Sequence, residues 1–246
     1  MNTRNLVGTA AVLSAGIVAA ADGPRGAVCF TFDDSHGANW VKADAVFKQY
    51  QAHATFFFHG EITPERVEAM KTLQQAGHSI GLHALHHRNA IPLQPGYSPA
   101  EYFEKEVKPQ LDVCIANGVK IRSFAYPNNR HDDAFDQEMF KHFDHLRAGL
   151  GPAKKLLYYP CNALPPKMVL GGAGIGTFYN SKLDELKSWI THAAETDTLI
   201  VFFSHNILPG ADRINMPSEW LEELLRHARS LNMRILGFDE LPSAAR

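Results

Sequence analysis

The stretch AVCFTFDDSH (residues 27–36) joins a short apolar run to two adjacent carboxylates, Asp33 and Asp34. An apolar run of this length that stops at charged residues predicts a buried strand. Paired aspartates after a strand often begin a helix, because a carboxylate accepts hydrogen bonds from the first helical N–H groups. The same pair can instead bind an ion or take part in catalysis. The rest of the sequence decides between these interpretations.

Short apolar runs recur along the chain, alternate with longer amphipathic stretches, and each predict a strand. The runs cover residues 27–32, 54–58, 79–82, 122–126, 145–149, 199–203 and 234–238. Helices are predicted over residues 40–51 and from Pro64 onward. Thr63 is a candidate cap for the second helix, and Gly77 is a candidate stop. The stretch 159–176, which contains several Pro and Gly residues, is predicted to be a long loop.

Strands that alternate with helices predict a parallel sheet covered by helices on both faces. No G-x-G-x-x-G follows the first apolar run, so a dinucleotide-binding fold has little support and a barrel is favoured. A chain of 246 residues with 45% hydrophobic residues can form one core of this size. We therefore predict an α/β barrel of about seven parallel strands, in which residues 22–246 form a single domain.

Charge and cysteine content exclude several classes of protein. The 24 Lys and Arg residues nearly balance 26 Asp and Glu residues, which leaves no basic stripe to follow phosphates, so nucleic acid is not an expected partner. Cys29, Cys114 and Cys161 are too few and too irregularly spaced for a disulfide framework or a cysteine-based zinc site. Stability is therefore expected to come from the apolar core.

Residues 1–21, MNTRNLVGTAAVLSAGIVAAA, predict a secretory signal peptide with its cleavage site at Ala19-Ala20-Ala21. A transmembrane anchor and a mistranslated upstream stretch are the alternatives. The run is rich in Ala and Gly and barely long enough to span a bilayer, which favours the signal peptide. We expect a secreted or periplasmic domain with no stable membrane insertion after signal cleavage.

Polar residues follow most of the predicted strands, at the end of a parallel barrel where functional residues gather. They are Asp33, Asp34, His59, His83, His86, His87, Asn128, Asn129, Arg147, His205 and Asp239. Each type has an ordinary explanation, as a helix cap, a surface loop residue or a hydrogen-bonded core histidine. Their joint occurrence instead predicts a site. His83 and His87, four residues apart and so expected on one side of a helical turn, are suited with a carboxylate to zinc.

Five segments resemble, in order and spacing, the motifs of the polysaccharide deacetylases, which are NodB-homology carbohydrate esterases of family 4. They are TFDD (31–34), ATFFFHG (54–60), the pair His83 and His87, FAYPNN (124–129) and FFSHN (202–206). The resemblance extends from about residue 26 to the LGFDEL stretch near the C-terminus. It implies a distorted (β/α) barrel, and metal-dependent removal of acetyl groups from an acetylated poly- or oligosaccharide.

The resemblance also assigns roles to individual residues. Asp34, His83 and His87 are expected to bind a divalent metal, most often Zn²⁺, with a position left open for water and substrate. Asp33 is expected to be the general base and His205 the general acid. The cap interpretation of the first stretch then survives mainly for a neighbouring hydroxyl, that of the serine at position 35.

The oxyanion contact follows from the same resemblance, with a backbone N–H at Asn128 expected to hold the oxyanion. Tyr126 and His36 are also expected to contact substrate, His36 because it lies close to the metal loop in the sequence. His59 is expected to be structural or to line the groove, and His86 to be exposed.

The sequence departs from the family pattern in its third motif. The family places there an arginine that orients the base, but Ala125 occupies the aligned position. We expect Arg147, at the end of the next predicted strand, to replace the missing arginine. Arg122 and Arg130 are poorer candidates.

Two more departures concern the histidines. Ala84 stands where Ser or Thr is usual in the second motif, and no convincing aspartate of the fourth motif lies between Met168 and Tyr179. An O-acetyl esterase remains an alternative, because the same site serves either leaving group. The absent arginine and the uncertain fourth motif also leave open a glycan-binding module with weakened catalysis on the same barrel. The FAYP form resembles the branch of exopolysaccharide deacetylases that act on poly-N-acetylglucosamine.

Overall fold

The computed structural model describes residues 23, 25–91, 96–150, 158–210 and 213–243. The predicted signal segment, residues 1–21, lies outside the described residues. Within the described ranges, no helix is both long and apolar enough to cross a membrane.

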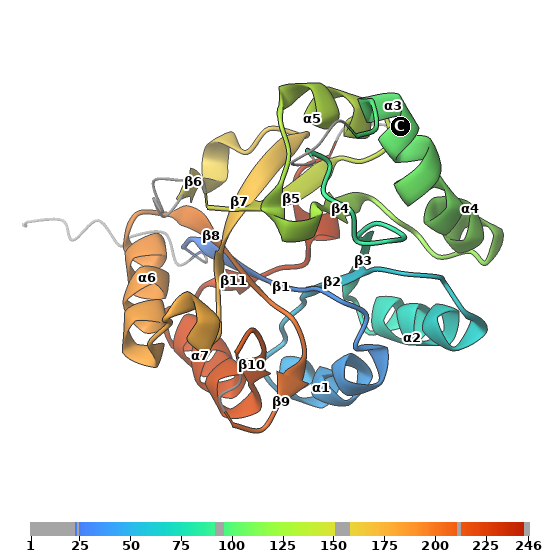
Figure 1. Ribbon diagram of the computed structural model, residues 1–246. Helices are drawn as coiled ribbons and strands as arrows, with labels where there is room; N and C mark the ends of the chain where they lie inside the picture. Colours follow the sequence, from blue (N-terminus) through green and yellow to red (C-terminus); the bar gives the residue numbers. More distant parts are fainter. Residues whose placement is uncertain (1–22, 24, 92–95, 151–157, 211–212, 244–246) are drawn as a thin grey trace, which may run out of the picture.

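Parallel strands close into a seven-stranded barrel (Figure 1). In order around the barrel they are β1 (Ala27–Phe32), β2 (Thr55–Phe58), β3 (Ser79–Leu82), β4 (Ser123–Ala125), β5 (His145–Gly149), β7 (Met168–Gly174) and β8 (Thr198–Ser204). β8 closes the ring by pairing along the whole of β1, from Ala27 opposite Leu199 to Phe32 opposite Ser204. The predicted α/β barrel is therefore confirmed.

Helices surround the barrel on its outer side (Figure 1). They are α1 (Gly37–Gln49), α2 (Pro64–Gln75), α3 (Pro99–Tyr102), α4 (Lys108–Ala116), α5 (Asp133–Met139), α6 (Leu183–Glu195) and α7 (Ser218–Ser230). The Thr63 hydroxyl accepts a hydrogen bond from the N–H of Arg66 and so caps α2. Gly77 follows the end of α2 with a φ of 95°, as predicted for a helix stop.

In the described part of the chain, four short strands lie outside the ring. β6 (Tyr159–Pro160) pairs antiparallel with β8, and β9 (Ile207–Leu208) pairs with β10 (Met216–Pro217) as a separate two-stranded sheet. β11 (Arg234–Ile235) pairs with the first two residues of β1.

The stretch 159–176, predicted to be a loop, contains the barrel strand β7, which corrects that prediction. β7 lies between β5 and β8 and pairs with both. Its glycines concealed it, because glycine is depleted in strands. The fold requires small residues there: a Cβ at Gly172 would lie 3.2 Å from the Phe203 ring, and one at Gly174 would lie 2.6 Å from the Tyr179 ring.

The predicted strand 234–238 also needs correction, because only its first two residues pair as β11. β11 pairs with β1 at the N-terminal end of β1, whereas β2 pairs with β1 only at Thr31 and Phe32. Asp239 therefore lies at the N-terminal end of the barrel, where its N–H donates to the hydroxyl of Ser79 at the start of β3. Asp239 does not belong to the predicted rim of functional residues.

Strand alternation decides which side chains point into the barrel. In β1, Val28 and Phe30 belong to the main core between strands and helices. Ala27 and Cys29 belong to a second cluster, which draws residues from β1, β2, β4, β7 and β8 and fills the barrel interior. Because successive side chains point to opposite faces, the inner row of β1 continues to Asp33, just past the strand end.

The same alternation applies to the other strands that carry predicted site residues. In β3, Ile80 and Leu82 pack outward, so His83 continues the inner row. In β5, Leu146 packs outward and Arg147 points inward. In β8, the inner row that includes Val201 continues to His205. Inner rows from four strands thus end in Asp33, His83, Arg147 and His205.

The glycine requirement of β7 can be tested by adding single methyl groups. Gly174→Ala is expected to lower the free energy of unfolding by about 1–3 kcal/mol, because the new Cβ would overlap the Tyr179 ring. Gly172→Ala, with its longer contact to Phe203, is the matched control and should cost less. Urea denaturation measures both differences, and a Gly174→Ala variant as stable as wild type would contradict this account.

Candidate active site

A buried ion pair joins β1 to β5 inside the barrel. Nη2 of Arg147 donates to Oδ2 of Asp33, and Nη1 donates to Oδ1 of Asn129 at 2.6 Å. The guanidinium also lies 4.9 Å from the centre of the Phe203 ring. Arg147 is only 1% exposed, so its charge depends on these contacts inside the protein; its Nε has no hydrogen-bond partner among the described residues.

Of the candidate arginines, Arg147 is the one that contacts Asp33. Residue 147 pairs directly with Ala125 across β4 and β5, so its side chain occupies the space beside the small alanine. Arg122 instead forms a hydrogen bond with Asp144 at 2.8 Å, at the N-terminal end of the barrel. Arg130 is exposed.

The surroundings of Asp33 favour its ionised form. Burial raises the pKa of this carboxyl, but the charges of Arg147, His83 and His205 outweigh burial and hold the pKa below its usual range. Oδ2 is bonded to Arg147, while Oδ1 is buried without a hydrogen-bond partner among the described residues. Asp33 therefore presents an ionised oxygen that can accept a proton.

Asp34, His83 and His87 form a compact triangle of ligand atoms. The Nε2 atoms of the two histidines lie 3.2 Å apart, and Oδ1 of Asp34 lies 3.7 Å from Nε2 of His83 and 3.6 Å from Nε2 of His87. Tetrahedral zinc with bonds near 2.0–2.1 Å separates neighbouring ligand atoms by about 3.3 Å. Oδ1 of Asp34 is buried and has no hydrogen-bond partner in the described part of the chain. Both the spacing and the unpaired oxygen fit a divalent metal.

A hydrogen bond fixes the orientation of the His83 ring. Its Nδ1 lies 2.8 Å from the carbonyl oxygen of Ala125, which can only accept, so Nδ1 carries the proton. Burial lowers the pKa of His83 to about 4, so the ring is neutral near pH 7. Its Nε2 lone pair is then available to a metal.

The segment that carries both histidines is a loop, so the predicted helical turn is wrong. Ala84 and His87 have positive φ values of 64° and 54°, which lie in the left-handed region. The N–H of His83 continues the pairing of β3 with β2 by donating to the carbonyl of Phe58. Tertiary contacts, not helical hydrogen bonds, bring the two rings together.

Neither aspartate of the opening stretch caps α1. The cap position is His36, with no side-chain hydrogen bond to the helix. The hydroxyl of Ser35, predicted to start that helix, instead accepts from the N–H of His59 at 2.7 Å and lies 2.8 Å from the His59 carbonyl. Asp34 and Ser35 both have positive φ, and this turn brings the Asp34 carboxylate to the two histidines.

His205 lies beside the triangle, with Nε2 3.6 Å from Oδ2 of Asp34. Its Nδ1 lies 3.0 Å from the carbonyl oxygen of Ile214, and its own carbonyl accepts from Nε1 of Trp40. The carbonyl of Ile214 thus orients the ring where the family pattern uses an aspartate. Sequence reasoning missed this contact, because a backbone acceptor leaves no signal in the sequence.

The predicted substrate contacts occupy different environments. Asn128 is exposed at the rim with a φ of 51°, and its side chain donates to Asn89. His36 is partly buried and packs edge-on against Trp40. Tyr126 borders the site but is fully buried, so a supporting role fits it better than direct contact with substrate.

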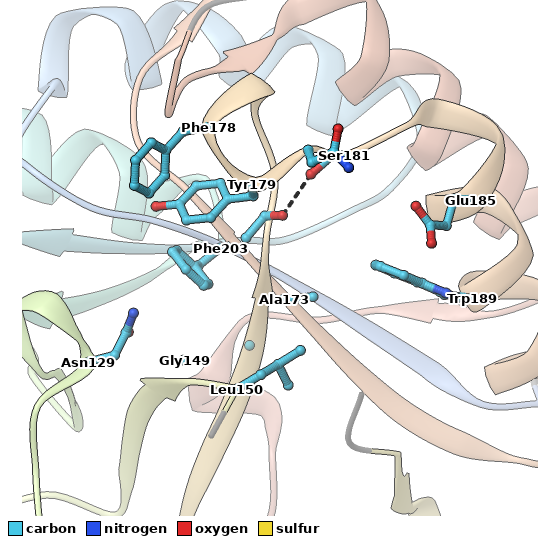
Figure 2. A pocket seen from close by; sticks show the side chains of 13 residues that line it. Asn129, Gly149, Leu150, Ala173, Phe178, Tyr179, Ser181, Glu185, Trp189 and Phe203 are labelled. Atoms are coloured by element: carbon cyan, nitrogen blue, oxygen red, sulfur yellow. Dashed lines mark hydrogen bonds between the residues drawn. The ribbon is translucent and has the colours of Figure 1, made fainter. Parts of the chain in front are cut away.

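Two cavities meet at this site. A cavity of about 210 Å³ contains the ion pair and the histidines, and a larger one of about 640 Å³ lies next to it. The residues that border both are Asn129, Phe178, Tyr179 and Phe203. Figure 2 shows the larger cavity, with Phe178, Tyr179 and Phe203 on one side and Trp189 and Glu185 on the other. The arrangement forms an aromatic cleft that leads away from the candidate metal ligands.

Phe178 and Tyr179 were not predicted from the sequence. Phe178 is 64% exposed, which is unusual for a large apolar side chain unless it contacts a ligand or partner. Burial, together with the nearby carboxylate of Asp33, raises the pKa of Tyr179 to about 12, so its hydroxyl keeps its proton and can donate. The available signal was the FY pair after the glycine-rich stretch.

Comparison with known proteins identifies related sequences. Residues 20–142, 123 of the 246 in the chain, match the family model described as Polysaccharide deacetylase. The protein named "Putative polysaccharide deacetylase YheN" of Bacillus subtilis (strain 168) is 32% identical over 78 residues. This match covers 32% of the present chain and only 28% of that relative.

Solved structures show the same fold. A CE4 family pseudoenzyme from Bacillus anthracis aligns with a TM-score of 0.58 at 15% identity, over 89% of this chain and 66% of its own. A family 4 acetyl xylan esterase from Clostridium thermocellum, in complex with a cobalt ion, aligns with a TM-score of 0.57 at 15% identity. The alignment covers 87% of this chain and 89% of the esterase chain. Identities this low establish a shared barrel and not a shared activity.

Removing the guanidinium should reverse the direction in which the pKa of Asp33 is shifted. In metal-free Arg147→Ala the pKa of Asp33 is expected to rise above its usual range, because burial then acts without its nearest positive charge. Wild type gains stability from this group as pH rises through the acid range, whereas the variant loses it. The uncompensated carboxylate should cost about 3–5 kcal/mol at neutral pH.

Carbon-13 NMR titration of aspartate carboxyls and denaturation at several pH values measure these two effects. Arg122→Ala is the matched control, because it removes another arginine–aspartate pair at the opposite end of the barrel. An Asp33 pKa that stays low in Arg147→Ala would exclude the ion pair as its cause.

Proposed function

This chain belongs to the polysaccharide deacetylase family, and we propose that it is a metal-dependent hydrolase that removes acetyl groups from N-acetylated sugars of a poly- or oligosaccharide. One observation carries the proposal. A triangle of potential metal-ligand atoms, the buried ionised carboxylate of Asp33 and the Nε2 of His205 lie together at one cavity, which His83, His87, Asp33 and His205 line. A hydrolytic site needs these three components together.

Asp34, His83 and His87 would hold the metal, with Zn²⁺ as the expected ion. When bound, such an ion polarises an acyl carbonyl and makes a water molecule more acidic near neutral pH. His83 is kept neutral by burial and correctly oriented by Ala125, so it needs no rearrangement to become a ligand.

Asp33 would act as the general base. Its Oδ2 lies 3.9 Å from Nε2 of His83, so the carboxylate is immediately beside the ligand triangle. Arg147 holds Oδ2 and leaves Oδ1 to accept the proton of the attacking water. Arg147 thereby keeps the base both ionised and oriented.

His205, as an imidazolium, would donate a proton from Nε2 to the leaving nitrogen, and the proton that Asp33 takes from water would restore the proton that His205 loses. The carbonyl of Ile214 holds Nδ1, so Nε2 is the atom that faces the ligand triangle and can donate. The backbone N–H of Asn128, at the rim of the same cavity, would stabilise the developing oxyanion.

The shape of the cleft supports a substrate larger than a single sugar. The catalytic cavity opens into the larger one across Tyr179 and Phe203, and the latter combines aromatic walls with polar groups on Asn180, Ser181 and Glu185. Aromatic faces with a few polar groups suit sugar rings, which have apolar faces and polar edges. We propose secretion or a periplasmic location, on the basis of residues 1–21.

Acetate release tests the function directly. The protein is incubated with chitin oligosaccharides, poly-N-acetylglucosamine and N-acetylglucosamine, and with O-acetylated xylan as the ester substrate. We expect release from the N-acetylated oligosaccharides, faster than from the monosaccharide, and its loss after chelation with recovery on adding Zn²⁺.

Three other outcomes would change the proposal. Release that ignores the chelator would exclude the metal mechanism. Release from xylan alone would indicate an O-acetyl esterase. No release from any substrate by the metal-bound protein would favour a glycan-binding module.

The two adjacent aspartates should respond differently to the same substitution. Asp34→Asn is expected to lower metal affinity by at least about tenfold, because it removes a charged ligand. Asp33→Asn is expected to keep its metal and lose about 10²–10⁴-fold in turnover, because the base is gone. Metal content after dialysis and acetate release measure the two effects. Equal loss of metal in both variants would contradict the assigned roles.

A further inference from the structure

The loop from His83 to Arg88 adopts a conformation that its own sequence does not favour. Ala84 and His87 both lie in the left-handed region, where a Cβ is unfavourable. Such residues persist only where the surrounding structure holds them. Because His87 is itself a proposed metal ligand, whatever holds the loop also positions a ligand.

Glu106 makes four of the polar contacts that hold this loop. Its Oε2 accepts from the backbone N–H of His86 at 2.9 Å, and its Oε1 lies 3.2 Å from Nδ1 of the same histidine. Oε1 also lies 3.3 Å from Nε of Arg88. The backbone carbonyl of Glu106 accepts from the N–H of Leu85 at 2.7 Å. One residue thus contacts the three loop residues that surround His87 in the sequence.

Burial of the Glu106 carboxylate makes these contacts necessary. Glu106 is fully buried, with 0% exposure, and a buried carboxylate is stable only when its oxygens are paired. Its partners on the loop satisfy both oxygens. Movement of the loop away from this position would remove the partners of a buried carboxylate, so the loop has one strongly preferred placement.

The helix that carries Glu106 is distorted at this residue. Residues Phe103–Val107 form a π-helical turn between α3 and α4, in which the N–H of Lys108 donates to the carbonyl of Phe103, five residues earlier. Pro109 follows within the first turn of α4, where it cannot donate to a preceding carbonyl. The wider turn is associated with a Glu106 carbonyl that bonds Leu85 of the loop. Such turns occur frequently at functional sites.

We infer that Glu106 is a positioning residue for the metal centre, which sets metal affinity by holding the His83–Arg88 loop through His86. The inference rests on the proposed metal site. It also accounts for Ala84: the hydroxyl that the family pattern places in this loop is absent, and a buried carboxylate from a neighbouring helix supplies the restraint instead.

Metal affinity, measured without substrate, tests this role. Dissociation constants for Zn²⁺ and Co²⁺ are determined by competition with a chromogenic chelator for wild type, Glu106→Gln and Glu106→Ala. Loss of a group that orients a ligand typically weakens metal binding 10–100-fold, and we expect this for Glu106→Ala. Glu106→Gln should be weakened less, because an amide oxygen can still accept from the N–H of His86. The visible spectrum of bound Co²⁺ should change in Glu106→Ala, as the ligand geometry relaxes.

Asp144→Asn is the matched control for general destabilisation. Asp144 is also a buried acid paired with an arginine, Arg122, but it precedes β5 at the opposite end of the barrel. This variant should lose stability and keep the wild-type metal affinity and Co²⁺ spectrum. Circular dichroism of each metal-free variant establishes that it is folded before metal is added.

The inference is overturned if Glu106→Ala binds metal with wild-type affinity and spectrum, or if Asp144→Asn weakens binding as much. It is also overturned if folded Glu106→Gln loses as much affinity as Glu106→Ala while retaining the loop contact. A wild-type protein that binds metal and releases no acetate contradicts the proposed activity alone, since the affinity comparison decides the role of Glu106 independently.

Discussion

The ion pair between Asp33 and Arg147 is the interaction on which the site depends. Two charges inside a barrel are stable only as a pair, and this pair spans 114 positions of the sequence, from the end of β1 to β5. It forms only if the ring is closed, because both residues belong to inner rows. Closure in turn requires β7, whose glycines let Phe203 and Tyr179 lie against the strand. The geometry of the candidate site and the topology of the barrel are therefore one constraint.

Strand alternation then determines which residues share the site. The inner rows of β1 and β8 carry apolar residues toward their N-terminal ends and finish in Asp33 and His205 at their C-terminal ends. Apolar side chains fill the N-terminal part of the barrel, and titratable groups occupy the C-terminal part, where loops can reach them. The apolar layers exclude water from the N-terminal side of the site, which strengthens the electrostatic effects on Asp33.

Local patterns in the sequence were sufficient for much of this arrangement. Apolar runs located six of the seven ring strands, and the cap at Thr63 and the stop at Gly77 depend on hydrogen bonds within a few residues. The rim was predictable because parallel strands end at one face. The sequence patterns did not predict β7, because close contacts with aromatic rings, and not strand propensity, require its glycines. Asp239 failed because pairing register, not the apolar run, decides where a strand ends.

Contacts between distant segments were beyond such patterns. The carbonyl of Ile214 that orients His205 carries no side-chain signal, and Glu106 lies on a helix that resembles any amphipathic helix in sequence. Arg147 could be proposed only from its strand-end position, and the register that sets it opposite Ala125 came from the structure.

The three departures from the family pattern share a physical explanation. In each case the group expected from the motif is absent, and a group from a separate segment occupies the required place: Arg147 for the missing arginine, a carbonyl for the missing aspartate, and Glu106 for the missing hydroxyl. A metal-dependent hydrolytic site constrains the positions of charges and lone pairs, not the strands that supply them. A motif can therefore lose a residue while the barrel keeps the geometry, provided that the substitute places its charge or lone pair at the same point.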